Sequence, residues 1–216
     1  MATPIRQTPI GRPMLDKYTR VYWTRFLTPT ARGLLHAGIS PDTVTVVGTL
    51  GVCAGALGFY PRGEFLWGTL VITAFVFADN VDGIMARLSG RESKWGAFLD
   101  SVLDRIADAA IFGALAVWYA GRGDNLRMTS LLIACLALGG VVSYARARAE
   151  GLGFTARGGI AERADRLLAV LVTTGLVGLF SLSDVVLEVV LWLLTAASAW
   201  TIYQRVSGVQ RQAAEA

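Results

Sequence analysis

Long, mostly apolar stretches alternate with short polar segments along the chain. Six stretches are apolar enough to be transmembrane candidates: residues 43–60, 65–78, 106–120, 128–145, 167–182 and 185–203. A helix needs about 20 mostly apolar residues to cross roughly 30 Å of hydrocarbon. The links at residues 60–63 and 181–184 are short, so the stretches that they join are expected to be antiparallel neighbours. The pattern predicts an all-α integral membrane protein with six transmembrane helices within residues 42–207.

The segment before the first stretch, residues 13–38, mixes apolar and basic side chains. Trp23 and Phe26 stand among Arg20 and Arg25, for example. Such a composition suits a helix that lies at the headgroup level with its basic face toward anionic lipid. We therefore expect an amphipathic juxtamembrane helix ahead of the six-helix bundle, and a single membrane domain over residues 1–216.

Composition and charge support the same picture. The chain is 54% hydrophobic and only 17% charged, which is rare for a soluble domain of 216 residues. If both termini are cytoplasmic, only Arg62, Arg122 and Arg127 of the 20 Lys and Arg residues fall on the outer side. Cytoplasmic segments of membrane proteins carry the excess of basic residues. A multi-pass protein with both termini in the cytoplasm is therefore predicted.

Four aspartates gather around the link between the second and third stretches. Asp79 and Asp82 are three residues apart, and Asp100 and Asp104 are four apart. Each pair therefore projects from one face of its helix. The link at residues 88–95 is short, which predicts that the two helices pack as antiparallel neighbours. The two pairs would then face one another near the cytoplasmic surface.

Carboxylates in or near a membrane need counter-charge, because ionised groups there are costly. Mg²⁺ and Mn²⁺ supply it and prefer oxygen ligands. Two cations about 4 Å apart can activate both oxygens of an in-line phosphoryl displacement. The spacing of the acids alone leaves a cation-coupled transporter open, but a transporter would not need Gly83, Ala86, Arg87 and Gly96 at their positions.

These positions resemble the signature of the CDP-alcohol phosphotransferase family. That signature has two Asp three apart followed by Gly, then Ala-Arg, a gap, Gly and two further Asp. The matching residues are Asp79, Asp82, Gly83, Ala86, Arg87, Gly96, Asp100 and Asp104, within 26 residues of sequence. The resemblance implies a homodimeric membrane enzyme that displaces CMP from a CDP-linked donor.

The resemblance also implies roles for individual residues. Asp79, Asp82, Asp100 and Asp104 would bind two divalent cations, Mg²⁺ or alternatively Mn²⁺, and Asp104 would also be the catalytic base. The implied donor site comprises Asp42, Thr45, Asp79, Asp82, Gly83, Ala86, Arg87 and Gly96. For Asp42, helix capping is an equal explanation, with Ser40 as the other candidate cap. Asp108 extends the line of Asp100 and Asp104, and it would either support the site or make a structural polar contact.

Five arginines stand at the cytoplasmic ends of the last three stretches: Arg146, Arg148, Arg163, Arg166 and Arg205. They could simply set the topology and hold anionic lipid. They could also form an anion pocket, because Arg makes bidentate contacts with phosphate. The resemblance assigns Arg146, Arg166 and Arg205 to an acceptor phosphate. Arg148 and Arg163 are weaker candidates, with ion pairs to Glu150, Glu162 or Asp165 as the alternative.

Three further segments, residues 28–45, 143–151 and 158–168, resemble the actinobacterial branch of the family. The reaction implied there joins CDP-diacylglycerol to inositol 1-phosphate and yields phosphatidylinositol phosphate and CMP. The expected location is a bacterial plasma membrane with the active site facing the cytoplasm. Glycerol 3-phosphate, the acceptor of phosphatidylglycerol-phosphate synthases, stays open because it is also an anion. Membrane lipid and a second copy of the chain are the other expected partners, with no nucleic acid.

Overall fold

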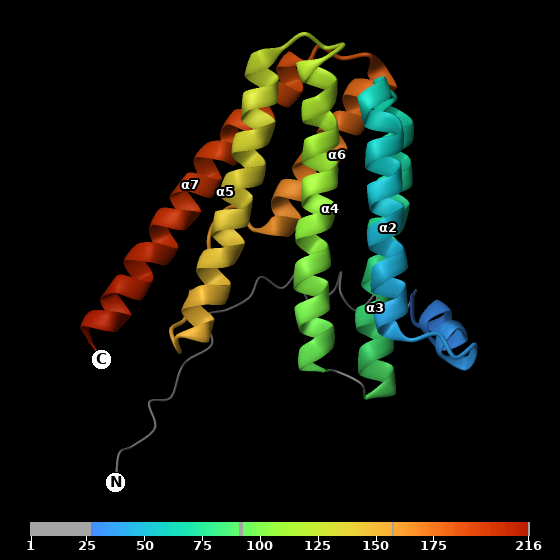
Figure 1. Ribbon diagram of the computed structural model, residues 1–216, viewed down its shortest axis with the longest axis vertical. Helices are drawn as coiled ribbons and strands as arrows, with labels where there is room; N and C mark the ends of the chain where they lie inside the picture. The colour runs from blue at the N-terminus through green and yellow to red at the C-terminus, as the bar shows by residue number, and fades with distance from the viewer. Residues whose placement is uncertain (1–26, 91–92, 157, 216) are drawn as a thin grey trace.

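The computed structural model describes residues 27–90, 93–156 and 158–215, and for residues 78–80 it describes the backbone alone. Every regular element within these residues is helical, as predicted. The long helices are α2 (Pro41–Phe59), α3 (Phe65–Ser89), α4 (Lys94–Ala120), α5 (Leu126–Gly151), α6 (Arg163–Phe180) and α7 (Val185–Ala214), and a 3₁₀ turn η1 (Tyr60–Arg62) follows α2. Figure 1 shows them as one elongated bundle that is tight at one end and spread at the other.

Local capping sets where the helices near the acidic residues begin and end. Ser40 caps α2 by accepting a hydrogen bond from the Thr43 N–H at 3.1 Å. Ser93 caps α4 in the same way through the Gly96 N–H. Gly90 ends α3 in the left-handed conformation, with φ of 64°, which glycine adopts without strain. Because Ser40 is the cap of α2, the carboxylate of Asp42 is not engaged as a helix cap.

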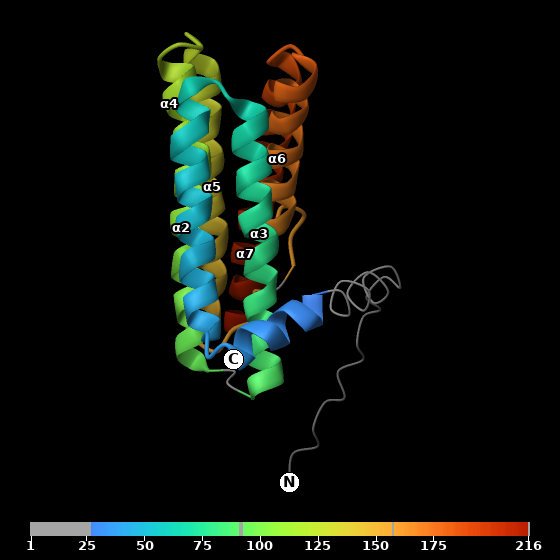
Figure 2. The same cartoon turned by 90° about the vertical axis from the view of Figure 1, so that its right-hand side faces the viewer.

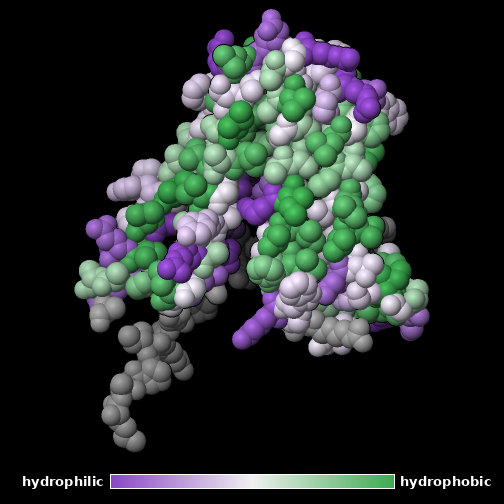
Figure 3. Space-filling view, in the orientation of Figure 1, coloured by the Kyte–Doolittle hydropathy of each residue, from purple (hydrophilic) through white to green (hydrophobic). Residues whose placement is uncertain are grey.

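Four of the helices are long and apolar enough to cross a membrane: α2 with η1, α3, α5 and α7. In α4 and α6, charged side chains occupy the N-terminal half and interrupt the apolar run. Hydrophobic side chains cover the middle of the bundle, whereas hydrophilic ones gather at its ends and in a hollow between the lower halves of α4 and α5 (Figure 3). An apolar belt of this kind is typical of a lipid-facing surface.

The helices pack around a closed ring. α2 contacts α3 and α4, α3 contacts α6, α6 contacts α7, α7 contacts α5, and α5 returns to α4 (Figures 1 and 2). Apolar side chains fill the ring at its tight end, among them Ile72, Ile111, Leu132, Val170 and Leu191, all without exposure to solvent. The spread end, where α3 passes to α4, carries the polar residues of interest.

The prediction that α3 and α4 pack directly on one another is wrong. They are consecutive and antiparallel, yet α2 is the helix that packs closely against both of them. Small residues on α2 allow this arrangement. A Cβ atom at Gly55 would come within 2.9 Å of the Val71 side chain of α3, so glycine brings the two backbones together.

The expected juxtamembrane helix over residues 13–38 lies outside the described residues up to position 26. Its remainder is helical over residues 27–36 and crosses the lower end of the bundle (Figure 2). Ala31 is fully buried there, and Leu34 and Leu35 pack with Ile84 and Met85 of α3. This contact braces the end of α3 that carries the acidic residues.

Candidate active site

Acidic side chains from three helices meet at the spread end of the ring. Asp82 lies on α3, and its carboxylate accepts a hydrogen bond from the Thr45 hydroxyl of α2. Asp42 of α2 and Asp100 of α4 lie close enough to repel the charge on Asp82. A Cβ atom at Gly96 would lie 3.6 Å from Asp42 Oδ1, so α2 and α4 approach closely at this point. Asp82 of the first motif half and Asp100 of the second therefore lie near each other, beside Asp42 of α2.

The remaining motif positions follow from the course of α3. Asp79 precedes Asp82 by three residues on this helix, but its side chain lies outside the described residues. Ala86 follows one turn after Asp82, and Arg87 is exposed to solvent beside it. Among the described side chains, a Cβ atom at Gly83 would meet only the Arg87 guanidinium, at 3.6 Å.

The carboxylates of Asp42, Asp82 and Asp100 form an acidic cluster. Among the residues that the structure describes, no Lys, Arg or His forms an ion pair with any of them. Like charges brought together without a basic partner are unfavourable unless a cation joins them. An all-oxygen donor set suits Mg²⁺ or Mn²⁺. The donor chemistry therefore fits a hard divalent cation.

The described side chains do not assemble a complete metal cage by themselves. No group of three His, Cys, Asp or Glu side chains among them is arranged closely enough to hold a metal ion. The predicted set includes Asp79, whose side chain lies outside the described residues.

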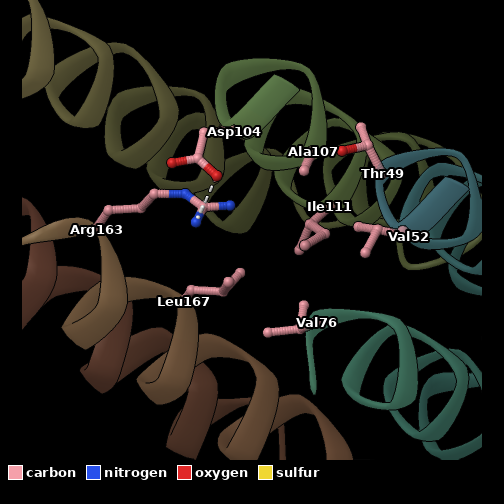
Figure 4. Close-up of a pocket in the computed structure, with 9 residues that line it drawn as sticks. Thr49, Val52, Val76, Asp104, Ala107, Ile111, Arg163 and Leu167 are labelled. Carbon is pink, nitrogen blue, oxygen red and sulfur yellow. Dashed lines mark ion pairs between the residues drawn. The ribbon is translucent and has the colours of Figure 1, made fainter. Parts of the chain in front are cut away.

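Asp104 is paired with arginine across the ring. Its Oδ1 lies 2.8 Å from Arg163 Nη1 of α6, and its Oδ2 lies 3.7 Å from Arg105 Nη2. Figure 4 shows Asp104 and Arg163 at the polar end of a cavity whose other lining is mostly apolar, with Val52 and Leu167 among it. The cavity volume is about 20 Å³, which is room for one water molecule.

Asp108 is the partner of three guanidinium groups. Its carboxylate lies 3.1 Å from Arg163 Nε, 3.5 Å from Arg105 Nη2 and 3.8 Å from Arg166 Nη2. Asp108 itself is only 6% exposed. Of the two roles expected for Asp108, the contacts therefore point to support of the arginines rather than of the acidic cluster.

Arg166 and Arg205 are buried and donate hydrogen bonds to backbone carbonyls. Arg166 is 2% exposed and donates to the Ala161 carbonyl at 3.1 Å. Arg205 is 5% exposed and donates to the carbonyls of Gly158 at 3.1 Å and Val142 at 2.5 Å. A guanidinium has five N–H donors, so each keeps some for a ligand.

The other predicted arginines are placed differently. Arg146 is exposed and pairs with Glu150 at 3.1 Å, and Arg148 is exposed. The alternative that Arg163 pairs with Glu150, Glu162 or Asp165 is wrong, because its partners are the two aspartates of α4. The ring places those aspartates directly across from the start of α6.

From the sequence, Arg105 is expected only to be one of the basic residues on the cytoplasmic side. In the structure Arg105 also donates to the Ser143 hydroxyl of α5, in addition to its contacts with Asp104 and Asp108. The signal was present in the sequence: Arg105 directly follows an acidic motif residue inside a helix, where a basic side chain needs an anionic partner.

The helical ring carries an acidic cluster and an arginine cluster at one end, an arrangement that suits a membrane enzyme acting on phosphorylated substrates. The chain belongs to the CDP-alcohol phosphatidyltransferase family, whose profile matches residues 38–203. It is 56% identical to the phosphatidylinositol phosphate synthase of Streptomyces avermitilis, over 96% of this chain and 87% of that protein. It is 40% identical to the protein of the same name from Mycolicibacterium smegmatis, over 89% of this chain and 87% of the relative.

Solved structures agree. The crystal structure of the Mycobacterium tuberculosis phosphatidylinositol phosphate synthase with CDP-DAG bound matches with a TM-score of 0.82 and 41% identity, over 86% of this chain and 94% of that one. A second structure of the same protein, in complex with manganese and citrate, also has a TM-score of 0.82, with 40% identity over 85% of this chain and 88% of that one.

Proposed function

We propose that this chain catalyses the phosphatidylinositol phosphate synthase reaction. It transfers the phosphatidyl group from CDP-diacylglycerol to inositol 1-phosphate and releases CMP. The observation that carries the proposal is the meeting, within one helical ring, of an acidic cluster without basic partners among the described residues and a separate set of inward-facing arginines. The first suits a cation-bound diphosphate, and the second suits a phosphorylated acceptor. The high identity to the Streptomyces relative supports the choice of acceptor.

We place six helices across the membrane, with α4 and α6 added to the four most apolar ones. The charged halves of α4 and α6 are compatible with this placement because Asp104 and Asp108 pair with Arg163 and Arg166 inside the ring. The basic residues then place both termini and the active site in the cytoplasm of a bacterial cell. The helix over residues 13–38 lies along the cytoplasmic surface, residues 1–216 form one domain, and two copies form a homodimer.

Asp79, Asp82, Asp100 and Asp104 are the proposed ligands of two divalent cations, Mg²⁺ or Mn²⁺. When bound, such cations neutralise the donor's diphosphate and stabilise the charge on the leaving CMP. The hydrogen bond from Thr45 orients the Asp82 carboxylate for this task. A ligand held by a partner in this way needs no reorientation when the cation arrives.

The donor is held at the turn of α3 and the start of α4. Gly83 and Gly96 lack side chains where the diphosphate is to approach, and Ala86 keeps the next turn small. Arg87 adds positive charge from the exposed side of α3. Asp42 completes the acidic cluster from α2. The acyl chains remain in lipid, against the apolar outer surface of the helices.

The acceptor phosphate is assigned to Arg146, Arg166 and Arg205, with Arg163 and Arg148 as further contacts. The hydrogen bonds of Arg166 and Arg205 to backbone carbonyls orient their guanidinium groups before the ligand arrives. Preorganised donors lose little conformational entropy on binding. The result is a rigid anion pocket at the ends of α5, α6 and α7.

Asp104 is the proposed general base. It lies one helical turn after Asp100 and is held toward Arg163, which places it between the acidic cluster and the arginines. From there its carboxylate takes the proton of the acceptor hydroxyl. The resulting alkoxide attacks the phosphorus that bears the lipid, and CMP leaves.

The reaction is tested directly with the purified protein in lipid vesicles. CDP-diacylglycerol and Mg²⁺ are supplied with inositol 1-phosphate, glycerol 3-phosphate or free inositol, one at a time, and CMP release is measured. Inositol 1-phosphate should support turnover and free inositol should not, because an unphosphorylated acceptor leaves the arginine pocket unpaired. Turnover with glycerol 3-phosphate instead identifies the alternative enzyme. Cation flux into the vesicles without CMP release with any acceptor identifies a transporter.

Replacing Asp104 with Asn is expected to remove the chemical step and leave substrate binding intact. Asn preserves the shape but cannot accept the proton, and general-base catalysis contributes about 10²- to 10⁴-fold. CMP release should fall by that factor, while CDP-diacylglycerol binding, measured by titration calorimetry, stays near the wild-type value. Loss of donor binding in this variant would assign Asp104 to the metal site alone.

Replacing Arg146 with Ala should weaken use of the acceptor without disturbing the fold, because Arg146 is exposed. Loss of one charge-assisted hydrogen bond raises KM for inositol 1-phosphate about tenfold or more, and KM for CDP-diacylglycerol should change little. Arg211→Ala is the matched control, since Arg211 bonds only its own helix, at the Ser207 carbonyl, within the described residues. An unchanged acceptor KM would show that Arg146 pairs with Glu150 and does not contact the acceptor.

A further inference from the structure

Thr201 of α7 anchors the segment that leads into α6. Its hydroxyl oxygen accepts hydrogen bonds from the backbone N–H groups of Ile160 and Ala161, both at 3.2 Å. It also donates to the Ala197 carbonyl at 2.8 Å. Thr201 is fully buried, and its hydroxyl is used both as donor and as double acceptor.

Gln212 holds the same segment three helical turns further on. Its Oε1 accepts from both the backbone N–H and the hydroxyl of Thr155, each at 2.9 Å. Its Nε2 donates to the Thr155 carbonyl at 2.7 Å. A separation of 11 residues returns to the same face of a helix, so Thr201 and Gln212 both face residues 155–161. The segment is thereby tied to α7 at both of its ends.

The anchored segment sets the start of α6. Ala161 is followed by Glu162, the N-cap of α6, whose N–H donates to Asp165 at 3.1 Å. The Ala161 carbonyl also accepts a hydrogen bond from Arg166 Nη1 at 3.1 Å. Arg163, the first residue of α6, reaches Asp104. The peptide that Thr201 fixes therefore determines where both α6 arginines stand.

We propose that Thr201 and Gln212 are positioning residues for the acceptor side of the site. Neither touches the reacting atoms; they hold residues 155–161 so that Arg163 and Arg166 meet the acceptor phosphate. The inference rests on the proposed function, because it concerns the same acceptor. Its mechanism is distinct from anion binding, since neither residue carries a charge.

A pair of substitutions at Thr201 separates the hydroxyl from the shape of the side chain. Thr201→Val keeps the shape and leaves two backbone N–H groups without their acceptor, whereas Thr201→Ser keeps the hydroxyl. In the full-length enzyme in vesicles, the Val variant should raise KM for inositol 1-phosphate about tenfold. KM for CDP-diacylglycerol should stay unchanged, and the Ser variant should restore the wild-type acceptor KM.

Gln212→Ala keeps the proposal testable if the Val variant fails to fold, because Gln212 lies at the exposed end of α7. It should raise the acceptor KM several-fold, while Gln210→Ala, an exposed neighbour with no bond to the segment, should not. A Val variant and a Gln212→Ala variant with lower kcat but wild-type acceptor KM would overturn the inference. If wild-type enzyme releases no CMP with inositol 1-phosphate, the proposed function itself has failed, which is a distinct result.

Discussion

The Asp100→Asn enzyme is expected to release almost no CMP while it still inserts and folds. Asp100 is exposed on α4 and forms no ion pair with the described residues, so its charge does not stabilise the metal-free fold. Its carboxylate is instead a proposed ligand of the cation. Mutation of a residue that merely supports a metal ligand lowers metal affinity or activity about 10- to 100-fold. Loss of a ligand itself should therefore lower CMP release by more than about 100-fold. CMP release at saturating Mg²⁺ measures the effect.

A second readout distinguishes this loss from simple damage. Asp100 repels Asp82 in the absence of a cation, so its neutralisation should raise the melting temperature of the metal-free protein. Mg²⁺ should stabilise the wild-type enzyme more than the variant, because only a bound ligand adds to stability. Asp124→Asn, at the opposite end of the bundle, is the matched control and should leave both quantities unchanged. Near-normal turnover by Asp100→Asn would contradict the shared cation site.

The Asp108→Asn enzyme is expected to lose both stability and use of the acceptor. Asp108 is buried and is the common anionic partner of Arg105, Arg163 and Arg166. Removal of one partner from a buried ion pair costs about 3–5 kcal/mol, because the other charge is left uncompensated. The unfolding free energy of the metal-free protein in detergent should fall by about that amount. The acceptor KM should rise in the same variant, since two of these arginines, Arg163 and Arg166, belong to the proposed pocket.

The matched control for Asp108 is an acid paired with arginine at the far end of the bundle. Glu188 pairs with Arg127 at 3.2 Å, and Arg127 is largely exposed. Solvent screens this pair from the Arg127 side, although Glu188 itself is only 16% exposed, so Glu188→Gln should cost less than Asp108→Asn. Asp108→Glu should recover part of the loss, because it retains the charge. Wild-type stability in Asp108→Asn would show that the arginines do not depend on this carboxylate.

Helix positions were predictable from sequence because they depend on local physics. Apolar runs marked the helices, and the structure extends several of them at their polar ends, as in α3, which runs from residue 65 to residue 89 rather than to 78. Ser40 and Ser93 cap helices through bonds that span three residues. Such interactions involve neighbours along the chain, and their signals therefore appear in short windows of sequence.

The acidic motif was also predictable, since its spacing places Asp79 with Asp82 and Asp100 with Asp104 on helix faces in any fold. Which partner each face meets was decided by packing alone. α2 packs closely on both α3 and α4, with Gly55 allowing the close approach to α3, and that arrangement brings Asp42 and Thr45 to Asp82. A short link specifies an antiparallel direction and leaves helix rotation and distance open.

The long-range pairs depended on the tertiary structure, whereas Arg146–Glu150 and Arg105–Asp108 form within one helix. Asp104 and Arg163 are far apart in sequence, and so are Thr155 and Gln212, which are joined by hydrogen bonds. Closure of the ring brings α6 against α3 and α7 and its first residue to Asp104, and the packing of α5 on α7 brings the segment after α5 to Gln212. Helix periodicity states which residues share a face of one helix. Only the packing of all the helices determines which charge that face meets, and the burial of Arg166 and Asp108 is the result.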